Sequence, residues 1–468
     1  MKRSLSISAA LLLAMISIPG EARAAATYAF ATCTDFSGPG CGSWVGLDPP
    51  RTAHTCVANV SSDPVARWAF GKIYVVNRLF ADNVQVLDPA NGFQSEPEHS
   101  VGNGTNPQDI AVLTPTKAYV SLLGAPYLLV FNPQNGAALD SIPLGAFADA
   151  DGIPDAFKML IYGDRVFLTL QRLDNFAPTA FSLVAVIDAS ADTVLDVDPE
   201  TPGAQAIRLT GTNPNTDLVF DPTTGHILVG EVGDFAALDG GVDVIDPATL
   251  RALGYETTEA KLGGNLADVA VSSQGGAYAA VTDVDFSGGS RLVRYDRGTG
   301  NLVKTLFSTA NYSVSEMETN DRDELWVCDR TLMSSGLRVF DTLGDTLVAG
   351  PISTNLPPFD VLFDAADVTG VPPHPGLDAG LRLVSLGPNP SQGEWEVRFE
   401  VGDGPALATR LRVFDARGAL VGDQDLGPTA AGPNRAAWRA GSGVRAGAYF
   451  FRLDRGGQTA SGRFTLVR

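Results

Sequence analysis

Polar side chains follow short apolar segments at intervals along the chain, and together they could bind a ligand or a metal. The segments, such as YVVN, FLTL and ILVG, are predicted to be the innermost strands of a ring-shaped fold, so their ends would converge on one opening of a central channel. The predicted ligand-binding residues there are Arg78, Gln171, Arg172, Glu231, Asp283, Asp329 and Arg330, and Asp35 occupies the equivalent place in the first repeat.

A second polar set opens another group of short apolar segments and consists of Asp109, Asp217, Asp268 and Asp360. Both sets are expected on the same face of the ring. Two interpretations are open for them: a ligand or metal site over the channel, or side chains that satisfy backbone N–H groups between neighbouring repeats.

The acidic segment DADGIPD is a separate candidate site. Its carboxylates Asp149, Asp151 and Asp155 surround Gly152, which allows a tight turn, as in part of a calcium-binding loop. The complete EF-hand pattern with its terminal Glu is missing. The segment therefore predicts either a calcium site, with calcium as the only cofactor suggested by the sequence, or an acidic loop that binds its own backbone.

Motifs of well-known catalytic chemistry are absent from the sequence. Its four histidines form neither HExxH nor a pair at metal-ligand spacing, and GxSxG and the phosphate-binding P-loop pattern do not occur. The segment GSGVRAG matches a dinucleotide-binding pattern formally, but no helix is predicted after it, so it is interpreted as a turn. The sequence predicts no catalytic residue.

The elements that must position these side chains are short strands with apolar residues at a period of two. Seven of them end at an Asp or Asn, whose side chain can bond the backbone two residues on and so stop a strand. These ends are Asp48, Asp88, Asn132, Asp188, Asp246, Asp296 and Asp341, at intervals of 40, 44, 56, 58, 50 and 45 residues. With a strand before each and further strands after it, the pattern is typical of propeller blades.

The fold predicted for residues 27–364 is therefore all-β, a seven-bladed β-propeller, in which the last short strand, at 360–363, completes the seventh blade. A β-solenoid has shorter repeats, and an array of separate domains would need linkers. Residues 365–380 have the composition of a linker, and the short alternating strands of residues 381–468 predict a small Ig-like β-sandwich.

The N-terminal residues 1–26 predict a secretory signal peptide. Lys2 and Arg3 precede the apolar run 5–18, and small residues surround the expected cleavage site at 22–26. No other apolar run is long enough to span a bilayer. We therefore expect an exported monomer that does not span a membrane and is secreted or held at the cell surface.

The net charge restricts the classes of molecule that could be partners of this protein. Residues 27–380 carry 18 Lys and Arg against 44 Asp and Glu, a net charge of −26, whereas residues 381–468 carry +4. Such an acidic body argues against nucleic acid as a partner.

The four cysteines lack CxxC spacing, and the oxidising environment outside the cytosol would allow them to form disulfides. Two pairings are open: Cys33 with Cys41 across the first hairpin, or Cys33 with Cys328 between the first and last blades.

Two family resemblances agree with this organisation. The strand, V-x-V-[IFL]-D and turn pattern, with "VGNGTNPQDIAV", "DADGIPDAFKML" and "FLTLQRLDNFAPT", resembles an uncharacterised bacterial branch of YVTN-type propeller repeat proteins over residues 27–364. The segments "GPNPSQGEWEVRFEV", "LRVFDARGALV" and "GAYFFRLDRGGQTASGRFTLVR" resemble the C-terminal sorting domain of type IX secretion and the Ig-like domain of flagellar hook-capping proteins. The second resemblance implies that residues 381–468 meet the secretion machinery and target or tether the protein.

Three functions are compatible with the sequence. The first is an exported, non-enzymatic propeller that binds an extracellular ligand, a protein or a glycan, or serves as a scaffold, with a C-terminal attachment domain. The second is a metal-dependent propeller hydrolase of the lactonase kind, and the third is a purely structural envelope component. Fold alone does not choose among them, but a hydrolase should bind a divalent ion stoichiometrically.

Overall fold

The computed structural model describes residues 26–364 except 176 and 285–287, and residues 381–467 except the short segments 388–390, 392, 402–405, 416–418, 431, 442 and 457. The predicted linker 365–380 and all but the last residue of the predicted signal peptide 1–26 lie outside the described residues. No helix among the described residues is long and apolar enough to cross a membrane.

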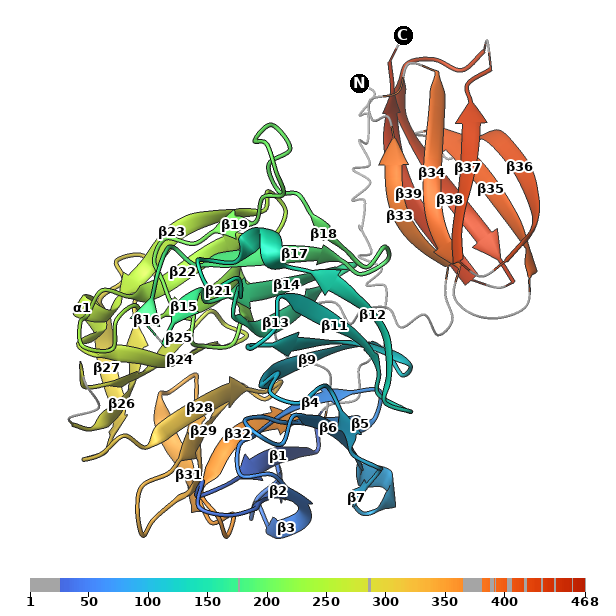
Figure 1. Ribbon diagram of the computed structural model, residues 1–468. Helices are drawn as coiled ribbons and strands as arrows, with labels where there is room; N and C mark the ends of the chain where they lie inside the picture. The colour runs from blue at the N-terminus through green and yellow to red at the C-terminus, as the bar shows by residue number, and fades with distance from the viewer. Residues whose placement is uncertain are drawn as a thin grey trace, which may run out of the picture.

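Seven four-stranded antiparallel sheets, with extra short strands on two of them, surround a central axis, so the predicted seven-bladed β-propeller is confirmed (Figure 1). The innermost strands, which contact the neighbouring blades around the axis, are β32 (Pro358–Phe363), β4 (Pro64–Ala69), β9 (Pro107–Thr114), β13 (Ala156–Tyr162), β20 (Val219–Phe220), β24 (Asn265–Val271) and β28 (Val314–Thr319), for blades 1 to 7 in order. The second strands are β1 (Tyr28–Cys33), β5 (Lys72–Asn77), β10 (Lys117–Leu122), β14 (Arg165–Leu170), β21 (Ile227–Glu231), β25 (Ala277–Thr282) and β29 (Glu324–Asp329).

The third strands carry the predicted turn signals at their ends. They are β2 (Gly40–Gly46), β6 (Asn83–Asp88), β11 (Tyr127–Asn132), β17 (Leu183–Asp188), β22 (Gly241–Asp246), β26 (Ser290–Tyr295) and β30 (Gly336–Asp341). The Asp88 carboxylate accepts the N–H of Ala90 at 3.1 Å, and the Asp246 carboxylate accepts that of Ala248 at 2.9 Å. Each Asp thus redirects its chain through a local hydrogen bond, which is why these strands stop where the sequence predicts.

The outer strands are shorter or more exposed. They are β3 (Ala53–Val60), β7 (Gln94–Ser95) with β8 (His99–Ser100), β12 (Ala137–Pro143), β18 (Thr193–Leu195) with β19 (Ile207–Arg208), β23 (Arg251–Thr258), β27 (Leu302–Ser308) and β31 (Thr346–Ile352). The hairpin β15 (Leu173–Asp174) and β16 (Ala177–Pro178), the helix α1 (Glu259–Leu262) and the 3-10 turns η1 (Pro89–Asn91) and η2 (Gly145–Phe147) lie in connections.

Blade 1 is built from both ends of the propeller segment. Strand β32 pairs with β1, with Ala29 opposite Phe363 and Ala31 opposite Val361. The prediction assigned this last strand to the seventh blade and took the second strand of every blade as the innermost one, and both assignments are wrong. Neighbouring strands of a buried blade are all apolar, so the sequence does not reveal which strand of each repeat lies innermost. That assignment depends on which strands pair through hydrogen bonds.

Apolar side chains fill the spaces between neighbouring blades. Blades 2 and 3, for example, share a buried cluster that includes Tyr74, Val76, Val120 and Phe131. Because each blade buries its faces against its neighbours, closure of the ring through β32 and β1 completes the core.

The disulfide joins Cys41 to Cys56, so the predicted pairing of Cys33 with Cys41 is wrong. Cys33 and Cys41 do stand opposite each other on β1 and β2, but a shift of register between β2 and β3 places Cys56 beside Cys41 on the other side. Cys33 and Cys328 are both buried and unbridged, so the alternative pairing is not formed either. A bulge of this kind leaves no clear signal in sequence.

The C-terminal residues form two antiparallel sheets. One contains β33 (Leu381–Gly387), β34 (Glu394–Val401) and β37 (Gly432–Arg439), and the other contains β36 (Leu420–Thr429), β35 (Leu407–Asp415), β38 (Gly447–Arg455) and β39 (Gln458–Leu466). The buried ring of Trp395 on the first sheet packs against Phe464 and Phe451 of the second, at centroid distances of 4.4 and 4.6 Å. This two-layer β-sandwich is the small second unit that the sequence predicts.

Candidate binding site in the central channel

Each blade contributes one ionisable side chain to a ring inside the channel. For blades 1 to 7 these are Asp360, Arg67, Asp109, Lys158, Asp217, Asp268 and Glu316, each on an innermost strand or within two residues before it. We call this set the channel ring. Its four aspartates are the second polar set predicted from the sequence, whereas Arg67, Lys158 and Glu316 were not predicted.

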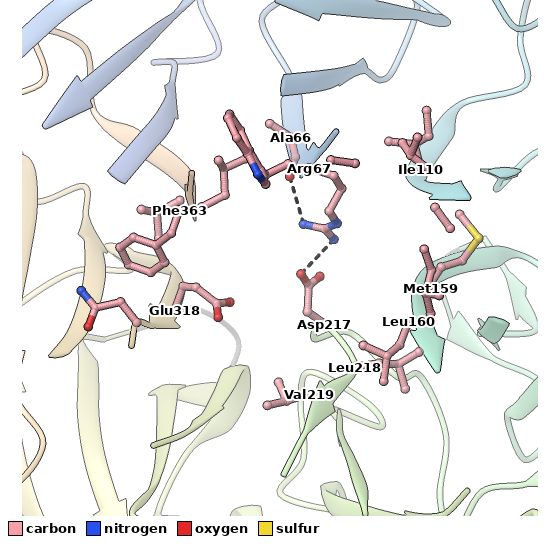
Figure 2. A pocket seen from close by; sticks show the side chains of 18 of the residues that line it. Ala66, Arg67, Ile110, Met159, Leu160, Asp217, Leu218, Val219, Glu318 and Phe363 are labelled. Carbon is pink, nitrogen blue, oxygen red and sulfur yellow. Dashed lines mark hydrogen bonds and ion pairs between the residues drawn. The ribbon is translucent and has the colours of Figure 1, made fainter. Parts of the chain in front are cut away.

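Arg67 links three blades at the centre of the ring. Its Nε lies 2.8 Å from Asp109 Oδ1. Its Nη2 lies 2.8 Å from Asp217 Oδ2 on the far side of the channel (Figure 2). Lys158 Nζ lies 2.5 Å from the other oxygen of Asp217. These ion pairs cross the axis and connect blades 2, 3, 4 and 5.

The remaining contacts of the ring are hydrogen bonds from the backbone of the next blade. Asp109 Oδ2 accepts the N–H of Met159 at 2.8 Å, Asp268 Oδ2 accepts that of Met317 at 2.7 Å, and Asp360 Oδ2 accepts that of Ala66 at 2.6 Å. Each bond joins one innermost strand to its neighbour. The predicted role at blade junctions is therefore real for these three aspartates, and it coexists with their position in the channel.

Five carboxyl groups face only two basic groups in the ring. Burial alone would raise the pKa of Asp217, but the Arg67 and Lys158 cations outweigh it and lower that pKa to about 2. Burial raises the pKa values of Asp268 and Glu316, and the neighbouring carboxylates add to the effect. The ring thus holds more acidic groups than its own bases neutralise, so protons or a bound cation must balance it.

A cavity of about 170 Å³ lies against the ring. Arg67 and Asp217 border it, and its other walls are largely apolar side chains that follow the ring residues along the innermost strands, including Ile110, Met159 and Val219 (Figure 2). Arg67 and Asp217 keep 24% and 20% of their side-chain surface exposed, which is consistent with their lining an accessible space. The cavity therefore combines a charged end with a mostly apolar body that also contains Glu318, Asn320 and Asp321.

The seven residues predicted to bind a ligand lie at the ends of the second strands of their blades or just after them, not at the ends of the innermost strands. Arg78 pairs with Asp63 at 2.5 Å, and Asp283 pairs with Arg291 at 2.7 Å. The Gln171 amide donates to Asn213 Oδ1 at 3.1 Å.

The other predicted residues are bound in the same way. Arg172 donates to the carbonyl of Phe181, Asp329 pairs with Arg338 at 2.7 Å, and Arg330 donates to the carbonyl of Thr34 at 2.8 Å. Asp35 accepts hydrogen bonds from Ser37 in its own turn. These polar groups hold loops and blades together, and their role in ligand binding stays a prediction.

Glu231, the seventh predicted residue, is completely buried. Its Oε2 accepts the hydroxyl of Tyr255 at 2.6 Å and the N–H of Gly211 at 2.8 Å, while Oε1 is buried and has no hydrogen-bond partner among the described residues. Burial raises the pKa of Glu231 to about 8, and the nearby Asp243 acts in the same direction. The sequence could not distinguish this buried acid from an exposed one.

The acidic loop of residues 149–155 uses its carboxylates largely on nearby backbone. Asp151 accepts the N–H of Ile153 at 2.7 Å, and Asp155 accepts that of Leu173 at 2.7 Å. Burial raises the pKa of Asp155 to about 6. Within the described residues, no three His, Cys, Asp or Glu side chains are arranged to hold a metal ion. The calcium site at Asp149, Asp151 and Asp155 stays a prediction.

Comparisons with known proteins support the fold and leave the site unassigned. No protein-family model and no curated protein matches the chain. A protein from Lactobacillus plantarum of known structure is 12% identical over 72% of this chain and 99% of its own, with a TM-score of 0.50. The virginiamycin B lyase from Staphylococcus aureus is 6% identical over 70% of this chain and 88% of its own, with a TM-score of 0.44. At these identities, the likeness concerns the propeller-type fold alone.

We predict that Glu231→Gln makes stability less dependent on pH. The folded protein keeps the Glu231 proton up to about pH 8, whereas the unfolded chain releases it near its ordinary value, so wild-type stability should fall as pH rises between those limits. Gln mimics the protonated acid, and the variant should gain up to a few kcal/mol at alkaline pH, at roughly 1.4 kcal/mol per tenfold change in proton affinity. Chemical denaturation at several pH values measures the gain. The exposed Glu200→Gln is the control, and equal pH profiles for both variants would contradict the assignment.

Proposed function

We propose that this protein is an exported β-propeller that binds a small amphipathic molecule in its channel cavity. The observation that carries the proposal is the channel ring at one end of a cavity whose walls are mostly apolar side chains, with Glu318, Asn320 and Asp321 as further polar residues. Ligand sites are typically concave and mostly apolar, with a few polar groups that fix orientation. Arg67 and Asp217 would supply that orientation here.

The dimensions and the charge of the cavity favour a particular ligand class. An apolar cavity of roughly 150 Å³ can hold a benzene-sized molecule, so a volume of about 170 Å³ suits a single ring with a short polar group. The excess of carboxyl groups favours a cationic group, such as an amine, over an anionic one. No observation favours the hydrolase or the purely structural alternative, and we propose no catalytic step.

Export and attachment belong to the same proposal. The signal-like residues 1–26, the acidic body and the disulfide between Cys41 and Cys56 support an oxidising compartment outside the cytosol. The β-sandwich of residues 381–467 has its own buried core and contains the segments that resemble sorting domains. We infer that it delivers the propeller to the cell surface or holds it there.

Filling the cavity should abolish ligand binding. Ala69 and Ile161 are half-buried residues of the cavity wall, so Ala69→Trp and Ile161→Trp should occupy the space without disturbing the ion pairs of the ring. Ligand-observed NMR with a library of small aromatic amines, acids and neutral analogues provides the measurement. We expect hits, mainly amines, that bind the wild type and the exposed control Ala90→Trp but neither filled variant. A library without hits, or hits that bind the filled variants equally, would refute the channel site.

Export can be tested in the native host. A chain that ends at residue 370 keeps every propeller strand, because β32 ends at Phe363, but loses the β-sandwich. We expect the full chain to be recovered outside the cytoplasm with an N-terminus near residue 27, and the shortened chain to fold but not to reach the surface. Thermal unfolding checks its fold. An intact N-terminus on the recovered protein would overturn export through a signal peptide, and surface delivery of the shortened chain would overturn the role of the β-sandwich.

A further inference from the structure

A second hollow, of about 410 Å³, lies between blades 1 and 2. Its walls are the loop after β1, the connection from β3 to β4 and the loop between β5 and β6. These segments meet at the starts of the innermost strands, whereas the walls of the channel cavity run toward the ends of those strands. We call the hollow the blade 1–2 groove, and it is separate from the channel cavity.

The polar groups of the groove are amides, hydroxyls and one carboxylate. They belong to Ser37, Asn59, Ser61, Ser62, Asn77, Asn83 and Glu98, and none of the described residues that line the groove is basic. An anionic ligand would find no cation to neutralise it. Amides and hydroxyls can both donate and accept hydrogen bonds, which matches a ligand whose own groups are hydroxyls.

A chain of hydrogen bonds fixes the floor of the groove. Asn77 accepts the N–H of Ser61 at 2.9 Å and donates to Asn83 Oδ1 at 2.8 Å. Asn83 in turn donates to Glu98 Oε2 at 3.1 Å. The side chain of Asn59, by contrast, makes no hydrogen bond to any described residue and is exposed. Fixed groups therefore stand beside an amide that is available to a ligand.

Phe36 adds an aromatic surface to one wall. It is 52% exposed, yet the Arg330 guanidinium lies 4.6 Å from its ring centroid and the Phe359 ring lies 5.3 Å away in an edge-on arrangement. Arg330 is itself held by the carbonyls of Thr34 and Pro358, at 2.8 and 3.1 Å. The Phe36 ring is thus exposed, but its contacts with Arg330 and Phe359 hold it in place, as a pre-organised binding surface requires.

Phe80 stands beside the opposite wall. It is 91% exposed and directly precedes Ala81, which lines the groove. Phe36 and Phe80 both have left-handed backbone conformations, with φ of 62° and 71°. Such conformations are uncommon for bulky residues and cluster at functional sites. Two loops thus hold phenyl rings in water at a cost in backbone energy.

We propose that the blade 1–2 groove binds a neutral saccharide. The C–H face of a sugar ring would pack on Phe36, and a neighbouring sugar of a longer chain would reach Phe80. The sugar hydroxyls would exchange hydrogen bonds with Asn59, Ser62 and Glu98. This site goes beyond the proposed channel function and does not depend on it.

Calorimetric titration of the chain from residue 27 with neutral oligosaccharides tests the site. The probes are hexamers of glucose, mannose, galactose, xylose and N-acetylglucosamine, with hexagalacturonate as the anionic comparison. We expect at least one neutral hexamer to bind and hexagalacturonate to bind more weakly. Phe36→Ala and Asn59→Ala should each weaken binding about tenfold or more, because each removes a direct contact.

Phe70→Ala is the matched control. Phe70 is also an exposed phenylalanine at a left-handed position, with φ of 49°, but it lies in the turn between β4 and β5, at the end of these strands opposite to the groove. Its variant should bind as the wild type does, and thermal unfolding should show that all three variants fold. The proposal is overturned if no neutral hexamer binds, if Phe36→Ala and Asn59→Ala leave binding unchanged, or if hexagalacturonate binds as well as the neutral hexamers. It is also overturned if a peptide array yields ligands that depend on Phe36 while no saccharide binds.

Discussion

Seven ionisable side chains, one from each blade, share the narrow space at the axis of the propeller, and their charges cannot all be neutralised among themselves. Moving charges out of water is costly unless each is paired or hydrogen-bonded. Arg67 meets this requirement by bridging Asp109 and Asp217 across the channel, and backbone N–H groups of neighbouring blades meet it for other members. The arrangement works only when the ring of blades is closed, so the channel chemistry and the closure of the fold depend on each other.

The same imbalance of charge is the basis of the ligand class proposed for the channel. Two bases are shared among five carboxyl groups, and the bases lie close to Asp217 and Asp109. Asp268 and Glu316 remain with raised pKa values because they are buried beside other acids. A cationic ligand in the adjacent cavity would relieve this excess, whereas an apolar ligand alone would not. The blade 1–2 groove differs in kind, since it lacks bases and contains amides, hydroxyls and an exposed aromatic ring.

Local chemistry explains how much of the fold could be predicted from the sequence. The Asp and Asn residues that end the third strands act through hydrogen bonds within their own turns, so the number of blades could be counted from their spacing. Which strand of each repeat lies innermost, by contrast, depends on which strands pair. Strand β32 pairs with β1 across more than three hundred residues of sequence, and no local signal reveals that choice.

The candidate site was predicted in part for the same reason. Asp109, Asp217, Asp268 and Asp360 recur at the start of similar segments, and so they could be recognised as a set. Arg67, Lys158 and Glu316 occupy equivalent places in strands of different sequence, namely ARWA, FKML and VSEM, and only the assembled ring brings them together. The disulfide was mispredicted because a bulge in β3, and not the hairpin register, places Cys56 beside Cys41.

A double-mutant cycle between Arg67 and Asp217 tests most directly whether the charged ring couples the blades. Arg67→Met, Asp217→Asn and the double variant are compared with the wild type by chemical denaturation, following the unfolding transition of the propeller. These residues belong to blades on opposite sides of the channel and lie in contact at 2.8 Å. We expect a coupling free energy of more than about 1 kcal/mol, as found for contacting residues in one network. Additive effects within about 0.5 kcal/mol, the behaviour of independent sites, would contradict the account.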